Sequence, residues 1–256
     1  MHPHDGNRRK RDIVPKPAHA EAGANARSAH SAHPFHHAEF LTTAADWSQL
    51  PADGAPEVAF AGRSNAGKSS AINALANHTR LAFVSKTPGR TQHINFFRLK
   101  SGALLADLPG YGYAKVPIEM RRYWQEFIAR YLAQREVLAG LVLVMDARRA
   151  MTELDRRMIE WFLPTGRSLH ILMTKSDKLS TSDQRRTMEG MRRSLDNDYG
   201  IYAAQTGVQL FSAMPRSGLA EAEAAIAPWV LMDAIGYTRS TAATSEKKER
   251  PRHQGE

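Results

Sequence analysis

The sequence predicts an α/β protein in three layers, with a mostly parallel sheet of about six strands and one antiparallel edge strand. Short apolar runs alternate with longer amphipathic stretches along most of the chain, the pattern of strands alternating with helices. A glycine-rich turn joins the first such run to the first amphipathic stretch, and a Ser-Gly pair at 101–102 separates two apolar runs as a hairpin turn does. The alternation implies right-handed crossovers and therefore mostly parallel pairing.

The folded domain is predicted to span residues 35–237. Residues 1–34 are rich in Ala, His, Pro and charge, and residues 238–256 in Ser, Thr, Lys and Glu. Segments of this composition bury too little apolar surface to offset ordering, so both are predicted to be disordered tails. Seven of the eleven histidines lie within residues 1–37. The sequence offers no partner element to hold His30, His33, His36 and His37, which favours a flexible tail over a metal site.

Composition narrows the class of protein. The formal net charge is +9, a basic balance that suits association with nucleic acid or a ribonucleoprotein. The chain has no cysteine, which excludes disulfides and cysteine metal sites. The longest apolar run, 137–145, is too short to span a bilayer. No apolar segment follows the basic run at 8–11, so no signal peptide is expected and the protein is predicted to be cytoplasmic, without membrane insertion.

The first half of the domain is predicted to hold three strands and one helix. Residues 57–61 are short, apolar and preceded by proline, the features of a buried strand. Residues 70–76 carry apolar side chains at helical spacing between good helix formers. Residues 93–99 and 103–107 form the two strands of the hairpin, and a Pro-Gly break at 109–112 ends the second strand.

The second half alternates more regularly. Apolar side chains recur at three- and four-residue steps over 118–136, a helix whose aromatic stripe is expected to face the core. Runs 140–146 and 169–173 are continuously apolar, as in strands buried on both faces. Between them, residues 152–155 resemble a capping box that opens a helix to about residue 162.

The last elements are a basic helix, a strand and a closing helix. They are predicted over residues 182–195, 208–211 and 218–232. Pro228 lies within the closing helix, where it is expected to kink the helix or, if the helix divides, to mark a first turn.

The glycine-rich turn fits the phosphate-loop pattern G-x-x-x-x-G-K-[ST]. Its residues are Gly62, Arg63, Ser64, Asn65, Ala66, Gly67, Lys68 and Ser69, followed by Ser70. Backbone N–H groups in such a turn surround a phosphate, and the helix N-terminus adds partial positive charge. Lys68 is expected to reach the β- and γ-phosphates, and the Ser69 hydroxyl to ligate Mg²⁺.

Three later strand ends carry related patterns, and ligands of open α/β sheets bind at the carboxyl ends of strands. The first is D-x-x-G, made of Asp107, Leu108, Pro109 and Gly110. Its carboxylate can hold Mg²⁺ through water, and the Gly110 N–H can meet a γ-phosphate.

The other two patterns point to a guanine base. Thr174, Lys175, Ser176 and Asp177 fit [NT]-K-x-D. Asp177 can accept hydrogen bonds from guanine N1–H and the 2-amino group, a pair that adenine does not offer. Lys175 is expected to lie along the base or to brace the phosphate loop. At the last strand end, a backbone N–H within Phe211, Ser212 and Ala213 can bind guanine O6.

The loop before the hairpin holds Gly89, Arg90 and Thr91. Thr91 is a candidate second hydroxyl ligand of Mg²⁺, drawn into place only by a bound γ-phosphate. The alternative is an ordinary loop threonine.

Taken together, these motifs resemble those of the bacterial EngB GTPases, also called YihA or YsxC, within the TrmE–Era–EngA–YihA–Septin-like class. The most distinctive parts are G-R-T-Q at 89–92 and D-L-P-G-Y-G-Y-A at 107–114. The resemblance covers about residues 37–236. It implies a Ras-like P-loop GTPase fold, GTP hydrolysis with Mg²⁺, a role in assembling the large ribosomal subunit, and a link to cell division and septation. Ser176 stands where many members have Ala.

Lys68, Thr91 and Gly110 are the candidate catalytic residues. No glutamine follows D-x-x-G to orient the attacking water, because Tyr111 occupies that position. Slow intrinsic hydrolysis, stimulated by a partner or by K⁺, is therefore expected. By the resemblance, Asn65 matches a K⁺-binding position; the alternative is an asparagine that braces the loop.

Three functions are compatible with these residues. The leading one is a monomeric GTPase switch, binding GTP and GDP, whose state controls association with the large ribosomal subunit or its precursor. The second, a metabolic P-loop ATPase or kinase, is opposed by Asp177. The third is an RNA- or ribosome-binding assembly factor that uses GTP mainly as a structural ligand. Five Arg-Arg pairs, at 121–122, 148–149, 156–157, 185–186 and 192–193, are solvated faces or contacts to ribosomal RNA.

Overall fold

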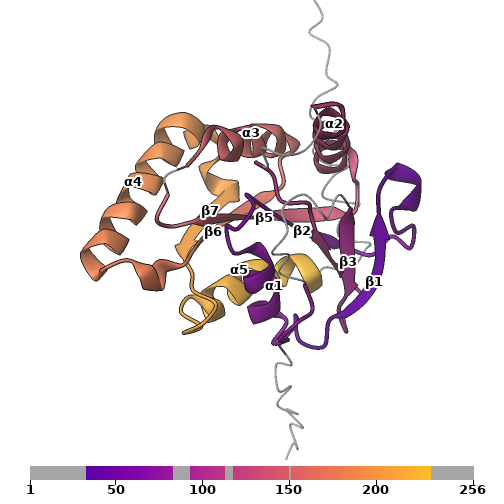
Figure 1. Cartoon of the computed structure of the whole chain (residues 1–256), viewed down its shortest axis with the longest axis horizontal. Helices are drawn as coiled ribbons and strands as arrows, with labels where there is room; N and C mark the ends of the chain where they lie inside the picture. Colours follow the sequence, from indigo (N-terminus) through magenta and orange to yellow (C-terminus); the bar gives the residue numbers. More distant parts are fainter. Residues whose placement is uncertain (1–32, 83–92, 113–117, 150, 232–256) are drawn as a thin grey trace, which may run out of the picture. The chain divides into compact units, whose positions relative to one another are not determined.

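The computed structural model describes residues 33–82, 93–112, 118–149 and 151–231 (Figure 1). The strands are β1 (Glu39–Ala44), β2 (Glu57–Gly62), β3 (Ile94–Arg98), β4 (Leu104–Asp107), β5 (Leu138–Asp146), β6 (Ser168–Thr174) and β7 (Thr206–Leu210). The α-helices are α1 (Lys68–Leu75), α2 (Ile118–Gln134), α3 (Glu153–Phe162), α4 (Thr181–Tyr199) and α5 (Leu219–Leu231). All six predicted strands and all five predicted helices are present.

The strands form one sheet in the order β1-β3-β4-β2-β5-β6-β7. Strands β4, β2, β5, β6 and β7 pair in parallel, whereas β3 is antiparallel to both of its neighbours. The predicted three-layer α/β fold is confirmed. The structure adds β1, a seventh strand outside β3. Its side chains are mostly exposed, with Phe40 60% accessible, so β1 lacks the apolar run by which the inner strands are found.

Two hydrophobic cores cover the two faces of the sheet. Buried side chains of α2, α3 and α4 pack on one face, and those of α1 and α5 on the other (Figure 1). In α2, Phe127, Ile128, Tyr131 and Leu132 are buried as expected, but Tyr123 is half-exposed and its hydroxyl donates to the Ala45 carbonyl at 3.3 Å. The aromatic stripe is therefore wider than the face that the sheet covers.

Helix boundaries follow local chemistry. The predicted capping box is present: the Thr152 N–H donates to the Asp155 carboxylate at 2.9 Å at the start of α3. Helix α1 begins at Lys68, two residues before the predicted start, because the phosphate loop leads directly into it. Helix α5 continues through Pro228 as a single element.

The arrangement of strands decides where the predicted motifs lie. Because β2, β4, β6 and β7 run in the same direction, their carboxyl ends meet at one edge of the sheet. The phosphate loop, D-x-x-G, T-K-S-D and F-S-A all follow these ends. The fold thus gathers the four motifs along a single edge.

Candidate functional site

The phosphate loop runs from the end of β2 to the start of α1, and two glycines shape it. A Cβ at Gly62 would lie 2.6 Å from the Val144 carbonyl oxygen, so any larger residue would push β2 away from β5. Gly67 has a φ of +104°, a left-handed conformation that favours glycine. Lys68 follows as the first residue of α1. The loop therefore ends at a helix N-terminus, where backbone N–H groups lack intrahelical partners and attract anions.

The carboxyl end of β6 braces this loop. The Thr174 hydroxyl hydrogen-bonds to the Ala66 carbonyl, and Lys175 Nζ donates to the Asn65 carbonyl at 2.6 Å. Of the two roles open to Lys175, bracing the loop is the one seen here. Because these two residues lie three and two positions before Asp177 in the chain, the same segment holds the loop and carries the predicted base-reading carboxylate.

Asp146, at the end of β5, is a site residue that none of the motifs includes. Its carboxylate accepts from Lys175 Nζ at 2.9 Å and from Nε and Nη2 of Arg148 at 2.9 and 2.7 Å. Partial burial raises its pKa, but the hydrogen bonds from Arg148 and Lys175 outweigh burial and hold the pKa below the ordinary value. Asp146 is thus ionised and fixes Lys175. In the sequence, Asp146 can be recognised as the carboxylate at the end of the run 140–146.

Lys68 and Asp107 form a buried ion pair beside the loop. Their side chains are 11% and 8% exposed, and Nζ of Lys68 contacts Oδ1 of Asp107. They lie 39 positions apart but meet because β4 pairs with β2. Ser69 follows Lys68 in the first turn of α1. A hydroxyl and a carboxylate are ligands that Mg²⁺ accepts, so Ser69 and Asp107 fit the predicted metal.

The D-x-x-G segment runs alongside the phosphate loop. The Ser64 N–H donates to the Tyr111 carbonyl at 2.9 Å, and the Tyr111 N–H donates to the Gly62 carbonyl at 3.3 Å. Leu108 is buried in the core, whereas Gly110 faces the loop, where a Cβ would lie 3.4 Å from the Ser64 Cα. The segment is therefore within reach of whatever the loop binds.

The side chain of Tyr111 is tied to helix α3. Its hydroxyl donates to Oδ1 of Asp155 at 2.7 Å. Burial, together with the Asp155 charge, raises the pKa of Tyr111 well above the ordinary value, so the hydroxyl keeps its proton. The residue that replaces glutamine after D-x-x-G is thus engaged by a helix, a contact that no pattern in the sequence indicates.

The T-K-S-D and F-S-A motifs meet at the other end of the edge. Oδ1 of Asp177 contacts the Ser212 hydroxyl, and its Oδ2 lies 3.0 Å from Lys178 Nζ. These contacts, with that of Ser212 the larger, lower the pKa of Asp177. The Ser176 hydroxyl donates to the Phe211 carbonyl at 3.1 Å, a contact that alanine at this position could not make.

Two of the three backbone N–H groups of the F-S-A motif already donate hydrogen bonds within the protein. The Phe211 N–H donates to the Met173 carbonyl at 2.9 Å, and the Ser212 N–H to the Ser217 carbonyl at 2.9 Å. Of the three residues predicted to bind guanine O6, Ala213 is the one whose N–H has no hydrogen bond among those of the described residues. Ala213 is therefore the candidate that we propose for this role.

Some predicted features are not tested by these contacts. Gly89, Arg90 and Thr91 lie outside the described residues. Asn65 is exposed, with a φ of +61°, and its proposed K⁺ contact stays a prediction. Among the described helices, none is long and apolar enough to cross a membrane.

Comparisons with known proteins agree with this geometry. A family described as "50S ribosome-binding GTPase" matches residues 57–175. A probable GTP-binding protein EngB of Azoarcus sp. (strain BH72) is 56% identical over 197 residues, or 77% of this chain and 93% of the relative. A probable GTP-binding protein EngB of Burkholderia pseudomallei (strain 1106a) is 52% identical over 215 residues, or 82% and 98%.

Solved structures share the fold. A crystal structure of a probable GTP-binding protein engB matches with a TM-score of 0.55 at 19% identity, over 68% of this chain and 98% of that chain. Era of Aquifex aeolicus, bound to GDP and AlF₄⁻, matches with a TM-score of 0.54 at 18% identity, over 69% and 57%. At such identities the likeness shows the fold alone.

Proposed function

The chain belongs to the EngB family of GTPases, and from this premise we propose that its sheet edge binds GTP and GDP and hydrolyses GTP. One observation carries the assignment of the site. Thr174 and Lys175 contact the phosphate loop directly and stand three and two residues before Asp177. A nucleotide whose phosphates lie in the loop therefore has its base within reach of a carboxylate that selects guanine.

Nucleotide binding exchanges the partners of Lys68. In the structure its ammonium group neutralises Asp107. Phosphate oxygens in the loop compete for the same ammonium group, since they carry more charge than one carboxylate. Asp107 is then free to hold Mg²⁺ through water, with Ser69 as the direct protein ligand. Mg²⁺ bound there supplies charge neutralisation for phosphoryl transfer.

The remaining catalytic groups are positioned around the γ-phosphate. The Gly110 N–H lies on the segment that borders the loop and would donate to a γ-phosphate oxygen. Thr91 is the proposed second hydroxyl ligand of Mg²⁺. We expect slow intrinsic hydrolysis, because the Tyr111 side chain is bound to Asp155 and does not orient the attacking water.

Stimulation by K⁺ is proposed through Asn65, which lies exposed on the phosphate loop. Single-turnover hydrolysis should be faster in K⁺ than in Na⁺ at equal ionic strength, and Asn65→Ala should remove the difference. Equal rates of the unaltered protein in the two salts would exclude this role.

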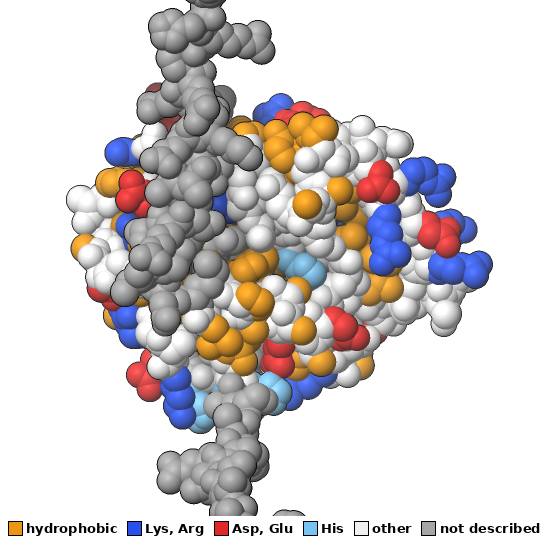
Figure 2. Space-filling model, turned by 180° about the vertical axis from the view of Figure 1, so that it is seen from behind, with side chains coloured by type: hydrophobic (Ala, Val, Ile, Leu, Met, Phe, Trp, Pro, Cys, Tyr) orange, Lys and Arg blue, Asp and Glu red, His pale blue; other side chains and the backbone are white. Residues whose placement is uncertain are grey.

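At the cellular level, we propose that the nucleotide state controls association with the large ribosomal subunit or its precursor. The family description and the net charge of +9 support this. Four arginines of α4, Arg185, Arg186, Arg192 and Arg193, are exposed. Figure 2 shows Lys and Arg side chains at the surface, interspersed with Asp and Glu. We also propose a link to cell division and septation, which rests on the family resemblance, and a cytoplasmic location, as predicted from the sequence.

The alternative, an RNA- or ribosome-binding factor with GTP as a structural ligand, makes a different prediction. Binding of purified ribosomal precursor should be stronger with GTP than with GDP or without nucleotide if the protein is a switch. Equal binding in all three conditions would favour the alternative. Contacts to RNA phosphates should also weaken steeply as salt increases.

The deciding experiment for the site is a competition of GTP, GDP and ATP for the purified full-length protein. GTP and GDP should displace a fluorescent guanine nucleotide, whereas ATP should be at least about 10³-fold weaker, because adenine offers Asp177 neither of the two donors of guanine, N1–H and the 2-amino group. Comparable displacement by ATP would overturn the proposed site.

A further inference from the structure

The turn that precedes β1 is anchored to helix α5. Phe35 is fully buried in the core cluster that also contains Ala222 and Ile226 of α5. The His36 N–H donates to the His33 carbonyl at 3.1 Å and closes a turn around Phe35. A buried aromatic side chain thus fixes the position of the two histidines on either side of it.

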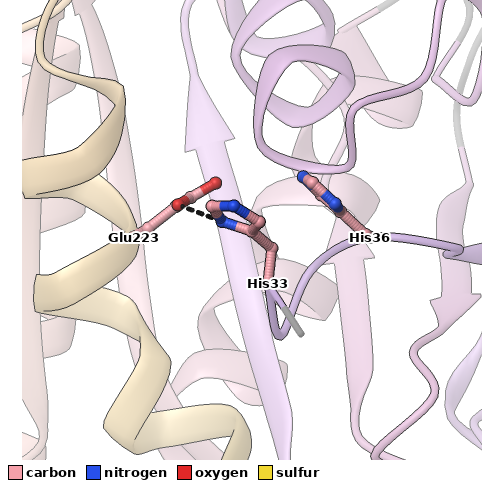
Figure 3. A group of neighbouring side chains, drawn as sticks. All are labelled: His33, His36 and Glu223. Carbon is pink, nitrogen blue, oxygen red and sulfur yellow. Dashed lines mark hydrogen bonds and ion pairs between the residues drawn. The ribbon is translucent and has the colours of Figure 1, made fainter. Parts of the chain in front are cut away.

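Glu223 of α5 faces these histidines (Figure 3). Its Oε2 lies 2.9 Å from Nδ1 of His33, and the His33 and His36 rings stack with their centroids 4.4 Å apart. One candidate ligand atom from each of the three residues lies within 4.8 Å of the others. The sequence alone offers no partner for these histidines, because Glu223 is 190 positions away from His33.

We propose that His33, His36 and Glu223 bind one divalent cation of the Zn²⁺ class and thereby tie the entry of β1 to α5. Two imidazoles and a carboxylate are donors that Zn²⁺ accepts, with a fourth position left for water. Among the residues that the structure describes, His33, His36 and Glu223 form the one group of three potential ligands (His, Cys, Asp or Glu) that lie close enough together to hold a metal ion. This site is separate from the proposed nucleotide site and does not depend on it.

The distances require a small closure. Zn–N bonds of about 2.0 Å in a tetrahedral site place two ligand atoms roughly 3.3 Å apart. The pair His33 and Glu223 already lies at 2.9 Å, so mainly His36 has to approach. His33 is exposed and His36 is half-buried, so rotation about their side-chain bonds can supply this movement.

The electrostatic surroundings are mixed. Burial, followed by the neighbouring His33, lowers the pKa of His36, and a neutral imidazole is the form that binds metal. Glu223 supplies negative charge. Arg216 acts against a bound cation: it also lowers the pKa of His36, although its guanidinium is held by the Asn77 side chain at 2.5 Å.

The competing interpretation is a metal-free ion pair between protonated His33 and Glu223. The two interpretations differ in whether the protein binds Zn²⁺ and in whether the Zn²⁺ affinity depends on Glu223. The full-length chain has five further histidines within residues 1–37 that could chelate Zn²⁺ without Glu223. A glutamate far away in the sequence therefore identifies the assembled site.

The experiment titrates Zn²⁺ into the metal-stripped full-length protein in excess Mg²⁺, with a chromophoric chelator as competitor. The variants are Glu223→Gln and, as a matched control on the same helix, the exposed Glu221→Gln. We expect one Zn²⁺ per chain at the tightest site, with affinity about tenfold or more weaker in Glu223→Gln and unchanged in Glu221→Gln. Zn²⁺ should also raise the unfolding temperature of the unaltered protein more than that of Glu223→Gln.

A second measurement covers the case in which a variant is unstable. Co²⁺ added to the unaltered protein should give the visible absorption of a tetrahedral site, and His36→Asn should reduce it, whereas His37→Asn should not. Equal Zn²⁺ affinity of Glu223→Gln and Glu221→Gln would show that the tail histidines alone hold the metal and would overturn the proposal. So would the absence of stoichiometric Zn²⁺ binding by the unaltered protein.

Discussion

Asp177 is the residue on which base choice rests in the proposed function. Asp177→Asn replaces a double acceptor by a group that can donate to the 2-carbonyl oxygen of xanthine. We expect affinity for GTP to fall by about 100-fold or more and xanthosine triphosphate to become the better ligand. Competition between the two nucleotides measures this, with the exposed Asp196→Asn as control. Unchanged preference for GTP would remove Asp177 from the site.

His170 is a residue whose protonation opposes folding. It is buried in β6, where Nε2 lies 2.8 Å from Oε1 of Gln209, and burial lowers its pKa below 6.5 despite that contact. The unfolded chain therefore takes up this proton first. Its contribution to stability is complete above about pH 6.5 and declines as the pH falls toward the lowered folded-state pKa.

Chemical denaturation at several pH values tests this. Between pH 7 and more acidic values, the free energy of unfolding of the unaltered protein should fall more steeply than that of His170→Gln, which cannot take up the proton. Parallel pH profiles for the two proteins would contradict the assignment.

At the scale of elements, Tyr111 joins the D-x-x-G segment to α3. Asp155 accepts from the Tyr111 hydroxyl and, at the same time, from the Thr152 N–H that opens the helix. Tyr111→Phe leaves a buried carboxylate with one donor fewer. We expect the free energy of unfolding to fall by about 1–3 kcal/mol, while the single-turnover rate of GTP hydrolysis changes less than about threefold.

The half-exposed Tyr123, whose hydroxyl also donates a hydrogen bond, is the matched control. Tyr123→Phe should change stability by less than about 0.5 kcal/mol. A large loss of hydrolysis in Tyr111→Phe with stability unchanged would instead place this hydroxyl in the reaction.

The contact between β5 and α5 allows no side chain at Gly140. A Cβ there would lie 2.5 Å from the Trp229 ring. Gly140→Ala should lower the free energy of unfolding by about 1–3 kcal/mol, because the ring is packed against the strand. Gly190→Ala in α4, where nothing lies within 4 Å, should instead stabilise by about 0.5–1 kcal/mol. Urea denaturation measures the change in the free energy of unfolding for each variant. A change of the same sign in both variants would contradict this packing argument.

At the scale of the whole molecule, the proposal is that residues 35–237 hold the GTPase domain, as a monomer, and that the tails 1–34 and 238–256 are not needed for it. A chain of residues 33–237, which keeps both proposed metal-binding histidines, should fold and bind GTP within about twofold of the full-length affinity. Light scattering tests whether the protein is a monomer, and nucleotide titration measures the affinity for GTP. A markedly weaker affinity would assign the tails to the site.

The candidate site was largely predictable because it is encoded by short patterns at strand ends. The phosphate loop, Asp107 and Asp177 each lie at or just after the end of an apolar run, and parallel strands bring such positions to one edge. Strand β1 was missed because its exposed side chains, Phe40 among them, carry no buried-strand pattern.

The sequence by itself determined the fold class, the inner strands and the order of the binding motifs, since glycine conformation, periodicity and spacing are local properties. Only the tertiary structure decided that Lys175 braces the loop, that Tyr111 binds Asp155, and that Glu223 meets His33. These contacts join residues 44 to 190 positions apart. Lys175 reaches the loop because β6 and β2 end at the same edge of one sheet, whereas the other two contacts depend on how α3 and α5 pack against the sheet. Local sequence encodes neither the strand order nor the helix packing.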